Sequence, residues 1–340
     1  MRSWSVAIAL SLLLLAGASG LWLQQELATP YFGGSTECFV DIPRGAGTSS
    51  IAEALTTAGV LHHELPFVLY VRWTGIGRRL QAGEYRFTNP ARPSQIARRL
   101  VQGDVFFHAI TIPEGLTAKE TIRLIARSGL GDERELEELL SRTDWISDLD
   151  SRATSLEGYL FPDTYRFSRH ATSADVLKAM VGEFRLRISM LLATSPLPSG
   201  WNVSQILTLA SLVEEEAKTT EERRLIASVL VNRLRRRMPL DCDPTIIYAL
   251  KQMGAYDGNL RKADMARSSP YNTYIHTGLP PGPIANPGAD SLLAALTPAK
   301  SDYLYYVSRN DGTHHFSKDL RSHLIAVARY QKHRVRTGPQ

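Results

Sequence analysis

The spacing of apolar and polar positions predicts a mainly helical protein with a few short strands. The clearest helix covers residues 205–218, in which a long apolar stretch is followed by Glu214, Glu215 and Glu216. At about 100° per residue, Glu215 falls opposite the apolar face, whereas Glu214 and Glu216 fall on its two flanks. A carboxyl held against apolar walls keeps its proton more readily and can act as a general acid near neutral pH. This pattern leaves Glu214 and Glu216 as alternatives, and a solvated acidic helix end is the simpler interpretation.

An uncharged segment covers residues 4–23. Its length matches the hydrocarbon core of a bilayer, which about 20 helical residues span. Trp4 and Trp22 stand near its ends, where an aromatic belt would lie. Arg2 precedes the segment and Glu26 follows it, so the pattern predicts a transmembrane helix with the main body of the chain outside the cytoplasm.

These flanks divide the N-terminal region into a cytoplasmic stub (residues 1–3), the transmembrane helix (residues 4–23) and a linker (residues 24–37). A cleaved signal peptide is the alternative, because the small residues 16–18 fit a cleavage site. Both interpretations place the body outside the cytoplasm.

A strand-turn-helix pattern then occurs twice. Residues 38–42 and 108–112 are the expected strands, and each helix is expected to begin with a capping box, Ser50 with Glu53 and Thr117 with Glu120. Three pairs of turn residues are each 70 positions apart, namely Pro43/Pro113, Gly45/Gly115 and Gly59/Gly129. Residues 38–107 hold no acid/base pair suited to catalysis, so we interpret them as a small structural or glycan-binding module.

The C-terminal part contains a long loop and a hairpin. Residues 268–287 are rich in Pro, Gly, Tyr, Asn and Thr, and such long loops in compact domains are usually functional, so we expect one wall of a binding groove. Residues 303–307 and 314–317 are expected to form a hairpin across the turn at residues 310–312. A capping box of Thr219 with Glu222 predicts the start of the helix before them.

Charge and cysteine content narrow the function. The 340 residues carry a net charge of +5, which suits an anionic partner. Nucleic acid is the poorest candidate, because the uncharged N-terminal segment directs the body outward. Cys38 and Cys242 could form a disulfide or remain two thiols. The chain has no zinc-type cysteine spacing, paired-His motif or Gly-rich phosphate loop, so neither a metal nor a cofactor is predicted.

Several motifs resemble the YceG-like endolytic murein transglycosylases and follow that family's order from about residue 40 to the C-terminus. They are Leu156-Glu157-Gly158, Phe161-Pro162-Asp163-Thr164-Tyr165, the 210–216 run with its three glutamates, Asn232-Arg233-Leu234, Asp243-Pro244-Thr245, Tyr271-Asn272-Thr273-Tyr274, the 278–284 run and the 287–291 run.

The resemblance implies an α+β fold: an N-terminal transmembrane helix, a small LysM-like module at residues 38–107, and a mainly helical catalytic domain at residues 108–336 with small hairpins and a lysozyme-like active site. It also implies a single-pass inner-membrane protein facing the periplasm. Its substrate would be nascent peptidoglycan, cut inside the strand between N-acetylmuramic acid and N-acetylglucosamine to leave 1,6-anhydro ends. Peptidoglycan synthases are candidate partners, and no cofactor is implied.

Within this resemblance, the family's catalytic glutamate falls on Glu216, and Glu215 replaces the lysine usual at the middle position. One acid suffices for a lyase that uses the sugar's own hydroxyl as nucleophile, whereas glycoside hydrolases need two carboxylates. Glu214 is expected to serve structure or substrate positioning through an Arg or Tyr partner. The other candidate substrate-binding residues are Asp243, Tyr271, Asn272 and Tyr274. A muramidase that uses water and a non-catalytic scaffold of the cell-wall machinery are the rival hypotheses.

Overall fold

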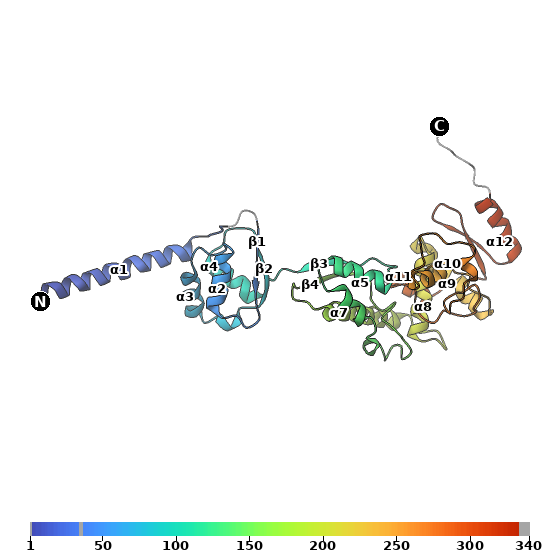
Figure 1. Ribbon diagram of the computed structural model, residues 1–340, viewed down its shortest axis with the longest axis horizontal. Helices are drawn as coiled ribbons and strands as arrows, with labels where there is room; N and C mark the ends of the chain where they lie inside the picture. The colour runs from blue at the N-terminus through green and yellow to red at the C-terminus, as the bar shows by residue number, and fades with distance from the viewer. Residues whose placement is uncertain (1, 34–36, 333–340) are drawn as a thin grey trace, which may run out of the picture. The chain divides into compact units, whose positions relative to one another are not determined.

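The computed structural model describes residues 2–33 and 37–332. Residues 1, 34–36 and 333–340 lie outside this description, and parts of the predicted stub, linker and C-terminal domain fall there. The chain divides into two compact units, which are described separately (Figure 1). Unit 1 comprises Met1–Ala109 and Arg166–Ala171, and unit 2 comprises Ile110–Tyr165 and Thr172–Gln340.

Unit 1 contains a long helix followed by a small strand-helix-helix-strand module. The helix is α1 (Arg2–Ala28), and the module runs through β1 (Cys38–Ile42), α2 (Thr48–Thr57), α3 (Glu64–Thr74), η1 (Gly77–Arg79), β2 (Gly83–Phe87) and α4 (Pro93–Gln102). β1 and β2 pair antiparallel, from Cys38 opposite Phe87 to Ile42 opposite Gly83. The helices bury one apolar face each against this ribbon, and the resulting core includes Leu55, Phe67 and Leu100.

α1 extends over the segment predicted to cross a membrane. In the part of the chain that the structure describes, no helix combines the length and the apolar character needed to span a bilayer.

The 70-residue repeat is visible in the backbone. α5 (Ala118–Arg127) begins and ends 70 positions after α2, and it follows β3 (His108–Thr111) as α2 follows β1. Gly45 and Gly115 have nearly equal left-handed φ angles of 80° and 81°. The two helix starts differ, because Thr117 and Glu120 form the predicted capping box whereas the box expected at Ser50 is wrong. α2 begins before Ser50, and its N-cap is Gly47, which offers no side-chain oxygen.

Unit 2 is mostly helical with two small ribbons, so the predicted α+β class is confirmed at this level. After α5, its elements are α6 (Glu133–Leu139), η2 (Thr143–Trp145), β4 (Thr164–Phe167), α7 (Ser173–Thr194), α8 (Val203–Glu216), α9 (Thr220–Arg235), α10 (Asp243–Gln252), η3 (Asp264–Ala266), α11 (Ala289–Leu296), β5 (Tyr305–Ser308), β6 (His314–Ser317), α12 (Leu320–Val327) and η4 (Ala328–Lys332). β3 pairs with β4, and β5 with β6. The predicted hairpin is therefore present, with Asn310 and Gly312 at positive φ in its turn.

α8 lies at the centre of unit 2. It packs against α9, α10 and α11 (Figure 1). Its N-terminus is closed by a capping box of Asn202 and Gln205, and residues 206–213 are all buried. Neighbours therefore surround almost every turn of α8. A side chain of α8 that meets a ligand must lie near one of its two ends.

Candidate active site

α8 ends at Glu216, and Ala217 after it is extended, so the three glutamates occupy the last helical turn. Successive helical positions point about 100° apart, and the three carboxylates therefore enter three different surroundings. Glu214 is nearly buried, Glu215 is exposed and Glu216 is half-buried. Their chemistry is set by the segments that each one meets.

Glu214 is held by an ion pair and a backbone hydrogen bond. Its side chain is 7% exposed, and Oε1 lies 3.0 Å from Arg223 Nη2 on α9. Oε2 accepts the Gly288 N–H at 3.0 Å, just before α11. Arg223 also donates from Nε to Ser291 Oγ at 3.0 Å and lies 3.6 Å from Glu114. Both oxygens of Glu214 are therefore engaged in joining α8, α9 and α11.

Glu215 was expected on the solvated side, and its side chain is indeed exposed. Its surroundings are nevertheless crowded, because Oε1 lies 3.0 Å from the point where a Cβ on Gly115 would stand. Partial burial raises the pKa of Glu215 to about 7, with Lys251 opposing this effect and Glu214 adding to it. The helical wheel of α8 alone could not reveal this neighbour, which belongs to the repeated turn about 100 residues earlier.

Glu216 lies among polar groups from two other segments, the start of α10 and β5. Burial raises the pKa of its carboxyl to about 7, and the negative charge of Asp243 acts in the same direction. The Tyr306 phenol and the Cys242 thiol favour the charged form and oppose the rise. A carboxyl balanced in this way can give and take a proton near neutral pH.

Asp243 and Tyr274 form a second pair beside Glu216. Asp243 is the first residue of α10 and is exposed, and the Tyr274 hydroxyl donates to its Oδ1 at 2.5 Å. Tyr274 comes from the long loop at residues 268–287. The structure thus brings together three of the residues suggested by sequence: Glu216, Asp243 and Tyr274.

Tyr271 and Asn272 have other surroundings. The Tyr271 ring packs on Tyr248, with centroids 4.9 Å apart, and remains half-buried. Asn272 is 1% exposed, its amide donates to Met265 O and Arg267 O, and its oxygen accepts the Tyr274 N–H. Asn272 therefore holds the loop in shape, and it offers almost no surface to a glycan.

Four residues that the structure places in or behind this site were not proposed as site residues from the sequence. Tyr306 and Cys242 contact Glu216, Arg223 holds Glu214, and Glu157 lies buried behind Tyr248. The only sequence signal for Cys242 was its position directly before the candidate residue Asp243. The sequence held no signal for Tyr306, because the strand pattern does not reveal which helix end its side chain meets.

Glu157 is a buried carboxyl that joins α5 to α10. It is 6% exposed, accepts the Ala118 N–H at 2.8 Å and lies 3.3 Å from the Tyr248 hydroxyl. Burial raises its pKa to about 7, although the Ala118 N–H favours its charged form. It stabilises the start of α5, which follows the crowded turn at Gly115.

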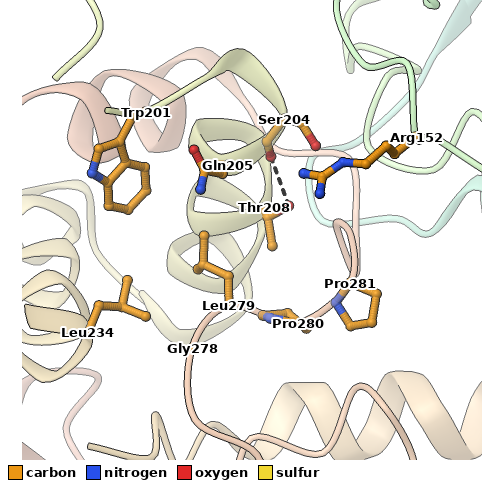
Figure 2. Close-up of a pocket in the computed structure, with 10 residues that line it drawn as sticks. All are labelled: Arg152, Trp201, Ser204, Gln205, Thr208, Leu234, Gly278, Leu279, Pro280 and Pro281. Atoms are coloured by element: carbon orange, nitrogen blue, oxygen red, sulfur yellow. Dashed lines mark hydrogen bonds between the residues drawn. The ribbon is translucent and has the colours of Figure 1, made fainter. Parts of the chain in front are cut away.

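A cavity of about 650 Å³ opens at the other end of α8 (Figure 2). Its lining includes Trp201, Ser204, Gln205 and Thr208 from the beginning of the helix, but none of the three glutamates.

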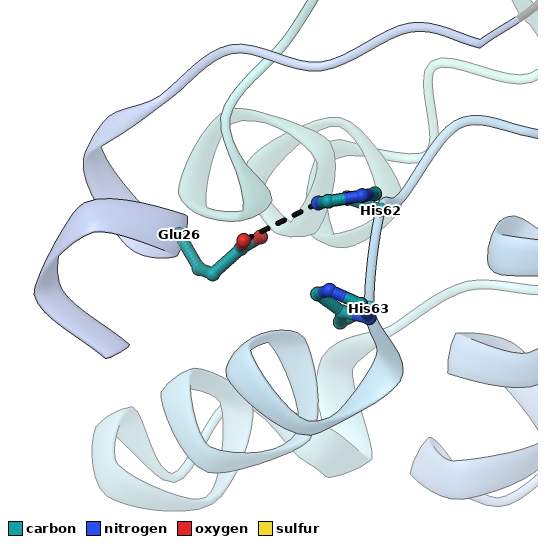
Figure 3. A group of neighbouring side chains, drawn as sticks. All are labelled: Glu26, His62 and His63. Atoms are coloured by element: carbon teal, nitrogen blue, oxygen red, sulfur yellow. Dashed lines mark hydrogen bonds and ion pairs between the residues drawn. The ribbon is translucent and has the colours of Figure 1, made fainter. Parts of the chain in front are cut away.

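One group of described residues in unit 1 could hold a metal ion. Glu26 at the end of α1 and His62 and His63 between α2 and α3 have ligand atoms within 4.8 Å of one another (Figure 3). His62 Nδ1 lies 3.2 Å from Glu26 Oε1. Cys38 and Cys242 are free thiols, Cys38 in unit 1 and Cys242 in unit 2.

The chain is similar to proteins of one family. The model of the YceG-like family matches residues 40–329. A Bacillus subtilis protein named endolytic murein transglycosylase is 33% identical over 333 residues, which cover 93% of this chain and 91% of that protein. A Streptococcus pneumoniae protein of the same name is 29% identical over 323 residues, covering 86% of this chain and 58% of that protein.

The crystal structure of a YceG-like protein from Listeria monocytogenes superposes with a TM-score of 0.57 at 29% identity, covering 86% of this chain and 99% of that one. These similarities confirm the resemblance seen in the motifs. Because the family match extends over most of the sequence, the chain belongs to the YceG-like family.

Proposed function

We propose that this protein is an endolytic lytic transglycosylase that cleaves nascent peptidoglycan strands between N-acetylmuramic acid and N-acetylglucosamine, with Glu216 as general acid and base. The enzyme class follows from the family and from relatives named endolytic murein transglycosylases. The observation that carries the assignment to Glu216 is its half-buried carboxyl, whose pKa is about 7 and which meets Tyr306, Cys242 and Asp243.

The proposed reaction needs a single carboxyl. Protonated Glu216 gives its proton to the glycosidic oxygen, which leaves as the 4-hydroxyl of N-acetylglucosamine. The C6 hydroxyl of the muramic acid attacks C1 and closes the 1,6-anhydro ring, and the Glu216 carboxylate takes the proton of that hydroxyl. No water is consumed, and the enzyme returns to its starting protonation state. A general acid of this kind contributes about 10²–10⁴-fold to the rate.

The neighbours of Glu216 suit these roles. Tyr306 keeps a hydrogen bond on the carboxylate formed after proton donation, so it steadies the charged form during the reaction. The Asp243–Tyr274 pair adds an exposed carboxylate and a half-buried phenol beside the acid, and such groups can hydrogen-bond sugar hydroxyls. Tyr271 is retained as a weaker candidate for glycan contact, whereas Asn272 is assigned to loop structure.

Glu215 is the alternative acid, because its pKa is also about 7. Its surroundings differ, since burial and the charges of Lys251, Glu214, Glu120 and Lys218 are the main influences on its pKa. The motif register also places the family's catalytic glutamate at Glu216. We therefore assign proton transfer to Glu216 and expect Glu215 to affect the rate only indirectly.

The decisive experiment is mass analysis of the products from purified peptidoglycan. Wild type should release 1,6-anhydro products, Glu216→Gln should lose at least a hundredfold in rate, and Glu215→Gln should keep most of it. Products heavier by one water would instead identify a muramidase, and no cleavage by wild type would favour a non-catalytic scaffold. A Glu215→Gln variant as inactive as Glu216→Gln would refute the assignment of the acid. Circular dichroism of each variant separates lost chemistry from lost folding.

Two further parts of the proposal concern the cellular location of the protein and the role of unit 1. The uncharged segment at residues 4–23 supports a single N-terminal anchor in the inner membrane with the catalytic unit in the periplasm, and this part depends on the sequence pattern alone. The β1-α2-α3-β2 order supports a LysM-like, glycan-binding module. Peptidoglycan synthases remain candidate partners. Recovery of the intact protein in the soluble periplasmic fraction would contradict the anchor.

A further inference from the structure

The cavity at the beginning of α8 has the size and lining of a ligand site. Its volume of about 650 Å³ lies within the range of about 300–1,000 Å³ usual for small-molecule sites. We call it the α8 cavity. Its lining consists of Arg152, Trp201, Ser204, Gln205, Thr208, Leu234, Gly278, Leu279, Pro280 and Pro281.

One side of the α8 cavity is apolar and the opposite side carries hydrogen-bond donors (Figure 2). Leu234, Leu279 and Pro280 form the apolar side. Trp201 is half-buried and presents an indole ring of the kind that covers the apolar face of a sugar. Gln205 accepts the Asn202 N–H through Oε1 at 3.0 Å, which leaves its NH₂ group to donate.

Arg152 gives the α8 cavity a positive charge. Its guanidinium is exposed, and no ion pair of this side chain occurs among residues 2–33 and 37–332. An unpaired guanidinium beside an apolar wall is suited to a carboxylate, with which it forms two parallel hydrogen bonds.

The segment that presents Arg152 is fastened to α8. Asp150 accepts hydrogen bonds from the Arg152 backbone N–H at 3.0 Å, from Ser204 Oγ at 2.6 Å and from the Tyr159 hydroxyl at 3.1 Å. These three bonds engage both oxygens of the Asp150 carboxylate. The backbone that carries Arg152 is therefore fixed before any ligand arrives, which lowers the entropic cost of binding.

The α8 cavity and Glu216 are joined by two shared elements. Thr208 lines the cavity and lies eight residues before Glu216, which corresponds to about 12 Å along a helix. The loop at residues 268–287 supplies Gly278–Pro281 to the cavity and Tyr274 to the pair beside Glu216. A polymer bound at Glu216 can therefore extend to the cavity, whereas a single sugar is too short.

We propose that the α8 cavity is a second substrate subsite, which binds a peptide-bearing muramoyl unit of the strand whose bond lies at Glu216. Arg152 pairs with a carboxylate of the peptide stem, and Trp201 covers a sugar face. This inference depends on the proposed function, because it takes the same strand as its ligand. It adds that the enzyme recognises the peptide stem at a distance from the cleaved bond.

The test uses the full-length protein with Glu216→Gln, so that strands bind without being cut. Equilibrium binding is measured for defined peptidoglycan oligosaccharides with their peptides and for the same oligosaccharides after the peptides are removed. Arg152→Ala should weaken binding of the peptide-bearing strands about tenfold and leave the peptide-free strands unchanged. Trp201→Ala should weaken both. Arg127→Ala, which removes an exposed arginine at the end of α5, is the matched control and should change neither.

Equal binding of peptide-bearing strands with and without Arg152→Ala would overturn the inference, as would a loss for both kinds of strand. The outcome is separate from the proposed reaction, which is judged by the release of anhydro ends from wild type. Anhydro products together with no effect of Arg152→Ala would remove the subsite and leave the reaction standing.

Discussion

Replacing Tyr306 by Phe removes one hydrogen-bond donor from Glu216 and keeps the ring. The phenol stabilises the charged carboxylate, so its loss raises the pKa of Glu216 above its present value of about 7. A hydrogen bond to a charged group is worth about 1.5–3 kcal/mol, and one pKa unit corresponds to about 1.4 kcal/mol. The pKa should therefore rise by about one to two units, and nearer one because solvent reaches the half-buried pair.

The sign of the effect on activity follows from the proposed mechanism. Proton donation requires protonated Glu216, so the rate falls on the alkaline side as pH passes the pKa of this carboxyl. In Tyr306→Phe the alkaline limb of the pH–rate profile should move upward by about one pH unit, measured as release of anhydro ends across pH 5–10.

Tyr305→Phe is the matched control, since Tyr305 is the neighbouring residue of β5 and its ring stacks on His323 instead. An alkaline limb that stays in place or moves downward in Tyr306→Phe would refute the reasoning. Equal movement in both variants would show that the effect arises from the strand and not from the contact with Glu216.

Three further predictions follow from the same contacts. Arg223→Ala leaves the Glu214 charge buried without its partner and should lower the free energy of unfolding by about 3–5 kcal/mol in urea titrations. Adding Glu214→Gln should recover part of this loss, and fully additive effects of the two substitutions would contradict the pairing. Glu157 has a folded pKa of about 7, above its unfolded value of 4.5. Its contribution to the free energy of unfolding is therefore present below about pH 4.5 and is lost as pH rises to 7. Glu157→Gln should reduce this pH-dependent loss of stability by up to about 3 kcal/mol, measured in melts at pH 5 and 8. Gly115→Ala and Gly45→Ala both place a side chain at φ near 80°, which should lower the free energy of unfolding by about 1 kcal/mol or more. Only Gly115→Ala also crowds Glu215, so it should slow cleavage more than Gly45→Ala. Equal cleavage rates of the two variants would contradict this.

Local patterns of the sequence predicted much of unit 2. The apolar spacing identified α8, the Asn-Asp-Gly turn identified the β5–β6 hairpin, and the capping box at Thr117 is present as expected. Each of these features is decided by residues within about ten positions of one another, and propensity and periodicity act over that range. The box expected at Thr219 is wrong in part, because Thr219 caps α9 without a side-chain bond and Glu222 instead accepts from His314.

The candidate site was only partly predictable, because its contacts join distant segments. Asp243 and Tyr274 were found from motifs, and they do meet, 31 residues apart. Asn272 occurs in the same motif but faces inward, and a linear pattern cannot distinguish a loop residue that binds from one that holds the loop together. Tyr306 could not be found from sequence, since its role arises only when folding brings its phenol to Glu216 at the end of α8.

The three glutamates show how one helix end obtains three chemistries from its neighbours. α9 and the start of α11 neutralise Glu214 with Arg223 and a backbone N–H, so this carboxylate stays engaged in structure. The turn at Gly115 restricts the space around Glu215, and burial and nearby charges set its pKa. β5 and the start of α10 supply Glu216 with a hydroxyl, a thiol and a nearby carboxylate. The proposed single-acid reaction needs a carboxyl that is protonated when the substrate arrives and stabilised after it has given up its proton, and the neighbours of Glu216 suit both conditions.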